Sequence, residues 1–260
     1  MDDHRDDATT GLRVTLLAAA FIGVGVGFLG GLLGKGGSAI ATPLLHAIGV
    51  PAIIAVASPL PATIPSTMVA GYAYSKERLV DWRVARWSVA FGVPATIAGA
   101  LMTRWISGDA LVKATDAILI ALGLRLLIGS RGEPTPDAPA APRSRLLLAA
   151  VATGVGVASG LLANSGGFLL APLYMTVLRL PIKTALASSL AVASVLAIPG
   201  TVVHAALGHI DWVLVAVFAA TSVPLSFLGA RVALRTDPHR LETIYGAALV
   251  LLGAVFLVLH

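Results

Sequence analysis

Hydrophobic residues along the chain fall into ten apolar runs, five on each side of a polar central segment. Runs of about 20 residues can span the hydrocarbon core of a membrane as helices, whereas runs of 11 or 12 residues cannot. The pattern predicts an all-α polytopic membrane protein with one short run in each half. The runs occupy roughly residues 12–33, 38–49, 53–74, 85–106 and 110–129, and then 146–162, 168–178, 183–203, 213–234 and 241–259.

The two sets of runs are related in sequence. Residues 30–45, GGLLGKGGSAIATPLL, align without gaps with residues 159–174, SGLLANSGGFLLAPLY, at an offset of 129. Beyond this stretch an offset of 130 pairs Ser58 with Ser188 and the Asp81–Trp82 pair with Asp211–Trp212. These matches indicate an internal duplication, which is typical of transporters with a site between the repeats. We predict a first repeat over 1–129, a proline-rich linker over 130–145 and a second repeat over 146–260.

Lysine and arginine residues predict how the repeats are oriented, because they accumulate in cytoplasmic loops. If each repeat is a broken, re-entrant helical hairpin followed by three transmembrane helices, twelve basic residues fall on the linker side and four on the other, with Lys35 at the hairpin tip and Arg125 within an apolar run left out. If each repeat crosses four times instead, the counts are nine and eight, which give no orientation. We therefore expect inverted repeats, with the linker cytoplasmic and both termini outside.

Composition excludes several classes of protein. The 260 residues are 57% hydrophobic and 12% charged, with a mean hydropathy of +0.89, so lipid must solvate most of the chain. The net charge of +5 comes from basic residues in short loops, and we predict no nucleic-acid partner. Because the chain has no cysteine and no cluster of acidic or histidine residues at one predicted membrane depth, we predict neither an enzyme nor a metal or other cofactor.

The glycine-rich breaks GKGGS and ANSGG predict the substrate site. Unwound backbone at membrane depth is tolerated only where protein buries it or where it lines a watery cavity. If the short runs that follow are half-helices, their N-termini offer free amides and a partial positive charge to an anion. Lys35 would add a full charge, unless its side chain extends to the membrane interface instead. The predicted substrate-binding residues are Gly34, Lys35, Gly36, Gly37, Ser38, Ser58, Asn164, Ser165, Gly166, Gly167 and Ser188.

Other residues are expected to have different roles. Small residues four positions apart predict close helix packing at Gly23, Gly27 and Gly31, and at Gly156 and Gly160. Asp81 and Asp211 each precede a tryptophan and are predicted to cap a helix. His204 is a candidate titrating group for proton coupling.

The first break with its flanks fits the pattern G-L-L-G-x-G-G-[small]-x(4)-P-L-L, a copy follows the linker, and LGHIDW spans residues 207–212. Together these motifs resemble the TauE/SafE sulfite exporter family of bacterial and archaeal membrane transporters, over about residues 14–259. The resemblance implies a multi-pass protein of the cell (inner) membrane that transports sulfite, sulfoacetate or another organosulfonate. Lys35 departs from the family, which often has glycine or an apolar residue there. The family motif falls on Gly34, Gly36, Gly37, Pro43, Gly166, Gly167 and Pro172.

We predict a secondary transporter of a small sulfur-containing anion that works by alternating access around a midplane site formed by the two breaks. A transporter of another small anion, such as a carboxylate, and an anion channel are the alternatives. The expected partners are the anionic substrate and the lipid bilayer. The sequence leaves open the coupling ion, the direction of transport and whether the protein forms a homo-oligomer.

Overall fold

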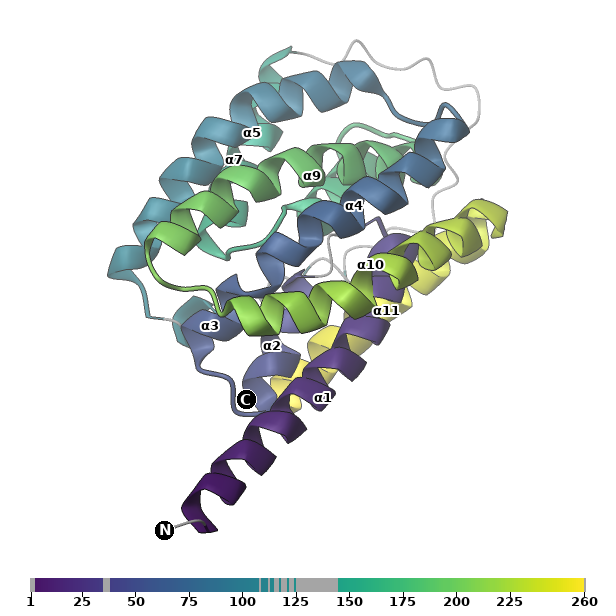
Figure 1. Ribbon diagram of the computed structural model, residues 1–260. Helices are drawn as coiled ribbons and strands as arrows, with labels where there is room; N and C mark the ends of the chain where they lie inside the picture. Colours follow the sequence, from purple (N-terminus) through teal and green to yellow (C-terminus); the bar gives the residue numbers. More distant parts are fainter. Residues whose placement is uncertain are drawn as a thin grey trace.

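The computed structural model describes residues 3–34, 38–107, 109–111, 113–114, 117, 121, 124 and 145–259, with only the backbone described for residues 3–14, 38–39, 249 and 252–259. Every regular element among these residues is helical (Figure 1). The helices are α1 (Asp3–Leu32), α2 (Ser38–Ala47), α3 (Ala52–Ala57), α4 (Pro59–Lys76), α5 (Trp82–Met102), the 3-10 helix η1 (Thr103–Trp105), α7 (Arg145–Leu161), α8 (Gly167–Thr176), α9 (Ile182–Ala206), α10 (Trp212–Arg235) and α11 (Pro238–Leu259).

Five described segments are long and apolar enough to cross a membrane, which makes this a polytopic membrane protein as predicted. The two short helices α2 and α8 have ten residues each, so each extends only about 15 Å along its axis. Residues 130–144 of the predicted linker lie outside the described residues, as does most of the apolar run over 110–129, and Arg145 is the first residue of α7. The candidate spans are Thr15–Leu32, Ala52–Lys76, Trp82–Trp105, Ile182–Ala206 and Trp212–Arg235.

Aspartate caps begin two of the long helices, as predicted. The Asp81 carboxylate accepts hydrogen bonds from two backbone N–H groups in the first turn of α5, each at 3.1 Å. Asp211 does the same for α10, at 2.9 and 3.1 Å. An aspartate at this position satisfies N–H groups that lack a partner within the helix. Both helices therefore begin where the sequence pattern places them.

Helices α1 and α10 run parallel and pack through glycine. A Cβ atom on Gly27 would overlap the backbone of Ser222, and one on Gly31 would overlap the carbonyl oxygen of Ser226. Small residues allow this approach of two backbones, which large side chains would prevent. The contact confirms the close packing predicted from the glycine spacing in the first half.

Helices α5 and α7 form a second parallel pair of the same kind. A Cβ atom on Gly156 would overlap the carbonyl oxygen of Gly92, and one on Gly160 would overlap that of Thr96. Each pair joins the first helix of one half of the chain to a helix of the other half. The two halves therefore interlock rather than pack as separate bodies.

The centre of the molecule is the crossing of α4 and α9, which lie side by side and run antiparallel (Figure 1). Gly71, near the end of α4, faces Leu190 near the start of α9, whereas Gly200 faces Leu60. Helices α1 and α10 run in the direction of α4, and α5 and α7 in that of α9.

Candidate functional site

The second glycine-rich break is a tight turn between α7 and α8. Its backbone enters the left-handed region twice, at Ala163 (φ +44°) and at Gly166 (φ +72°). The Asn164 N–H donates to the carbonyl of Ser159 at 2.9 Å, and the Ser159 hydroxyl donates to the carbonyl of Asn164. The side-chain oxygen of Asn164 accepts a hydrogen bond from the Gly166 N–H at 2.7 Å. These bonds hold the turn in one conformation at the N-terminus of α8.

Two polar groups in this turn are buried without a partner. The side-chain nitrogen of Asn164 and the hydroxyl of Ser165 find no hydrogen-bond partner among the described residues, although Asn164 is 2% and Ser165 1% exposed. Because the Gly166 N–H can only donate, the oxygen of the Asn164 amide must face it, and the amide's two donor hydrogens remain. Buried donors without acceptors are costly, so a bound acceptor would stabilise this turn.

The turn also brings these donors to a helix N-terminus. The first N–H groups of a helix have no acceptor within the helix and carry a partial positive charge. In α8 the Gly166 carbonyl accepts from the N–H groups of Leu169 and Leu170, at 3.0 and 2.9 Å, so the helix is regular from its first turn. The structure thus brings together the predicted residues of the second break, namely Asn164, Ser165, Gly166 and Gly167, all of them buried.

The first break is described only at its edges. Gly34 has φ +63°, and its carbonyl accepts a hydrogen bond from the Ser189 hydroxyl at 2.8 Å. Lys35, Gly36 and Gly37 lie outside the described residues, and Ser38 is described only as the first backbone residue of α2. Gly34 is therefore the one predicted residue of this break that can be placed, against the first half of α9.

Gly34 and the end of α7 contact α9 at different levels. Gly34 meets Ser189, whereas the carbonyl of Gly160, at the end of α7, meets His204. Fifteen residues separate Ser189 from His204, which corresponds to about 22 Å along a helix. The relative position of the two breaks stays a prediction, because Lys35, Gly36 and Gly37 lie outside the described residues.

Ser58 and Ser188 occupy equivalent positions in the two halves, and the hydroxyl of each contacts the residue that caps a helix of the other half. The hydroxyl oxygen of Ser58 accepts from the backbone N–H of Asp211 at 2.9 Å, and that of Ser188 from the N–H of Asp81, also at 2.9 Å. Each serine thereby joins a helix of one half to a helix start in the other. The structure gives both residues a partner outside the breaks.

His204 belongs to a pair that sequence reasoning did not find. Its side chain is fully buried, with Nε2 at 3.2 Å from the Gly160 carbonyl oxygen and Nδ1 at 3.1 Å from Nδ1 of His209. His209 lies in the loop between α9 and α10 and is half-buried. The sequence does hold a signal for this pair, because His209 follows His204 by five residues. The chain turns back between them at Gly208 (φ +72°), which brings the two rings together.

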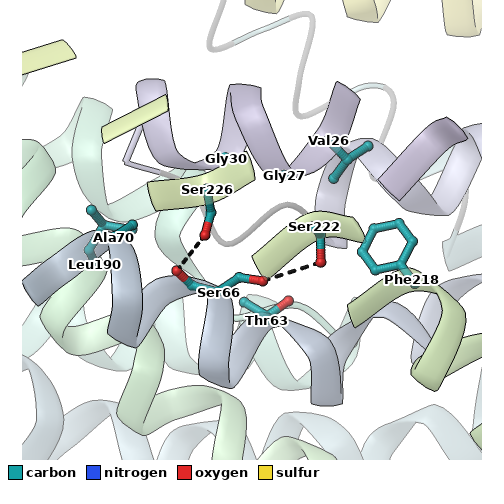
Figure 2. A pocket seen from close by; sticks show the side chains of 10 residues that line it. All are labelled: Val26, Gly27, Gly30, Thr63, Ser66, Ala70, Leu190, Phe218, Ser222 and Ser226. Atoms are coloured by element: carbon teal, nitrogen blue, oxygen red, sulfur yellow. Dashed lines mark hydrogen bonds between the residues drawn. The ribbon is translucent and has the colours of Figure 1, made fainter. Parts of the chain in front are cut away.

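A second polar cluster lies between α1, α4 and α10 (Figure 2). The hydroxyls of Ser66 and Ser222 lie 3.3 Å apart, and the Ser226 hydroxyl donates to the Ser66 carbonyl at 2.9 Å. The cavity beside them measures about 10 Å³, close to the least that holds one water molecule. It is too small for an anion of several heavy atoms, so the candidate substrate site is the second break.

Comparison with known proteins agrees with this multi-pass architecture. Residues 19–256 match the family described as "Sulfite exporter TauE/SafE". The chain belongs to the TauE/SafE family. No solved structure is significantly similar to this TauE/SafE protein.

Relatives that resemble the TauE/SafE chain over most of their length carry transporter names. A "Probable membrane transporter protein" of Xylella fastidiosa (strain 9a5c) is 30% identical over 235 residues, covering 86% of this chain and 88% of the relative. "Probable membrane transporter protein YunE" of Bacillus subtilis (strain 168) is 23% identical over 259 residues, covering 89% and 93%. The TauE/SafE protein thus groups with membrane transporters rather than with enzymes.

Proposed function

We propose that this TauE/SafE protein is a secondary transporter of a small sulfur-containing anion, such as sulfite, sulfoacetate or another organosulfonate, in the inner membrane of a bacterial or archaeal cell. The proposal is carried by two donors at the second break, on Asn164 and Ser165, that have no partner among the described residues. They lie at the N-terminus of α8, where the helix dipole and the first-turn amides favour an anion.

The chemistry of the second break suits an oxyanion. A sulfite or sulfonate group carries three oxygens on one sulfur, and each oxygen accepts hydrogen bonds from neutral donors. The Asn164 amide, the Ser165 hydroxyl and the helix amides offer donors of this kind in one turn. Binding through neutral donors permits release, because no buried ion pair must be broken when the anion leaves.

The arrangement of the helices supports inverted repeats and alternating access. Helices α4 and α9 hold equivalent positions in the two halves and run antiparallel. The α1–α10 pair has its equivalent in the α7–α5 pair, and the two serine-to-cap bonds are reciprocal. A two-fold axis in the membrane plane relates such elements, which is the symmetry on which rocking transporters are built.

The contacts of Gly34 with Ser189 and of Gly160 with His204 support a separate place for each break in the proposed cycle. In this proposal each break is an anion cradle on its own side of the α4–α9 crossing, and movement of the interlocked halves opens the path between them. The first cradle comprises Gly34, Gly36, Gly37 and Ser38, and Lys35 supplies it with a full positive charge.

Counterflow in proteoliposomes tests the proposal. We expect the wild-type protein to exchange labelled sulfite with saturation, to be inhibited by methanesulfonate, and to be inhibited much less by acetate. Ser165→Ala is expected to weaken the exchange, whereas Ser194→Ala serves as the control, because that hydroxyl donates within its own helix to Ala191. Exchange of acetate alone would favour a carboxylate transporter, and flux without saturation or counterflow would favour a channel.

A further inference from the structure

The two histidines and the end of α7 form a continuous hydrogen-bonded chain. The Gly160 carbonyl can only accept, so Nε2 of His204 carries the hydrogen of their 3.2 Å bond. Nδ1 of a neutral His204 is then an acceptor, and Nδ1 of His209, 3.1 Å away, must donate to it. This assignment leaves Nε2 of His209 as the basic nitrogen, on the side chain that is partly open to solvent.

The inner end of the chain lies close to the second break. Gly160 also accepts from the N–H of Ala163 at 3.2 Å, and Asn164 follows directly. His204 is fully buried, whereas His209 stands in the loop over residues 207–211, on the side with few basic residues. The pair therefore connects the aqueous side of that loop to the turn that carries the unpartnered donors.

Few other charged groups face His204 from the described parts of the helices packed around it. Arg104, just after α5, has an exposed side chain, and the Asp211 carboxylate is engaged in capping α10. Arg145 and Lys76 stand at the far ends of α7 and α4, and on α8 the Tyr174 hydroxyl donates to Ser88 at 2.6 Å. A proton on His204 would therefore be the dominant positive charge near the second break among the described residues.

We infer that His209 and His204 form a proton-transfer path that couples proton movement to anion transport at the second break. The inference rests on the proposed function of that break. A proton from water binds Nε2 of His209, and the proton on Nδ1 of His209 passes to Nδ1 of His204. His204 then carries both hydrogens and one positive charge, while His209 is neutral again. The charge attracts the anion, so proton and anion move in the same direction.

The first half of the chain lacks this path, which provides an internal control. At the offset of 130, Tyr74 stands where the second half has His204, and Leu79 where it has His209. The Tyr74 hydroxyl is buried and has no hydrogen-bond partner among the described residues. A phenol at the position of His204 and a leucine at that of His209 cannot take up a proton from the surface and pass it on. Among the described residues, this histidine path therefore belongs to the second half alone.

Two transport assays separate this inference from the proposed function on which it rests. Counterflow at equal pH on both sides measures exchange of labelled sulfite or sulfoacetate, and accumulation driven by a pH gradient measures coupling. We expect His209→Gln to keep most of its counterflow, and both His204→Gln and His209→Gln to show driven accumulation reduced at least about tenfold. Glutamine at position 204 can still donate to Gly160, so the fold is preserved. His239→Gln, at an exposed residue of α11, and Tyr74→Phe are the controls.

The outcomes are distinct. Wild-type counterflow together with gradient-driven accumulation that both glutamine variants lose supports the path. Wild-type counterflow with no response to a pH gradient, or accumulation by both variants at the level of His239→Gln, overturns it while leaving the proposed function intact. If the wild-type protein exchanges neither anion, the proposed function fails and the inference falls with it.

Discussion

The hydroxyl of Ser58 accepts a hydrogen bond from the backbone N–H of Asp211, 153 residues further along the chain, at 2.9 Å. The equivalent serine of the second half, Ser188, accepts from Asp81 at the same distance. Ser58, just before α4, thus fixes the start of α10, and Ser188, in α9, fixes the start of α5. In both cases the serine and the helix start belong to different halves of the chain. The two bonds hold the interlocked halves in register, and they explain why a serine is useful at both positions.

Removal of either serine hydroxyl should destabilise the protein. Ser58→Ala and Ser188→Ala each take away a buried acceptor of a backbone N–H, which costs about 1–3 kcal/mol. Thermal unfolding in detergent measures the loss, with Ser194→Ala as the control that removes only a bond within one helix. Melting temperatures equal to that of the control would show that these bonds do not hold the halves together.

Glycines at the parallel helix pairs should tolerate no side chain. Gly27→Ala and Gly160→Ala force a methyl group into the backbone of a neighbouring helix and should cost about 1–3 kcal/mol. Gly25→Ala and Gly154→Ala are matched controls, because a Cβ atom there meets nothing within 4 Å and alanine favours the helix. A thermal scan of the four variants checks the contrast; equal stability across them would contradict the packing.

Acidification should destabilise the wild-type protein partly through His209. Burial lowers the pKa of His209 below its usual value of 6.5, because the charged imidazolium is the form that burial disfavours. The neutral form is thus favoured in the folded protein, and its stabilising contribution is present above pH 6.5 and lost as the pH falls through the lowered pKa. We expect the melting temperature of His209→Gln to depend less on pH between about 7 and 5 than that of the wild type. Parallel curves would contradict this role.

Lys35 should strengthen anion binding at the first break. Lys35→Ala removes a full charge from the predicted cradle, and we expect the KM for sulfite counterflow to rise about tenfold, equivalent to about 1.4 kcal/mol. Lys35→Arg keeps the charge and should retain most of the affinity. An unchanged KM in Lys35→Ala would indicate instead that the side chain extends to the membrane interface.

The sequence predicts local features of this fold well because they depend on neighbours in the chain. The apolar runs give the long helices, the aspartates before Trp82 and Trp212 cap α5 and α10, and the spacing of Gly27 and Gly31 gives the close packing. Even the short helices α2 and α8 follow from the length of their runs. Each of these signals lies within a few turns of one helix.

Contacts between distant segments were not predictable in the same way. The hydroxyl of Ser58 could face a substrate or another helix, and only the crossing of α4 over the start of α10 decides between them. His209 became a partner of His204 because the loop turns back at Gly208. Pro59, which has no N–H, separates α3 from α4, whereas Ser189 at the equivalent position leaves α9 continuous. The candidate site at the second break could be predicted because its glycines, asparagine and serine are adjacent in sequence.

The most direct test of the central claim is labelled sulfite counterflow by Asn164→Asp. Aspartate keeps the oxygen that accepts from the Gly166 N–H, so the turn is preserved, but it replaces the unpartnered donor nitrogen with a negatively charged oxygen. If the second break binds the anion, like-charge repulsion of several kcal/mol should reduce exchange by at least about 100-fold in variant protein that still shows a cooperative thermal transition. Exchange at the wild-type level in this variant would show that the anion binds elsewhere.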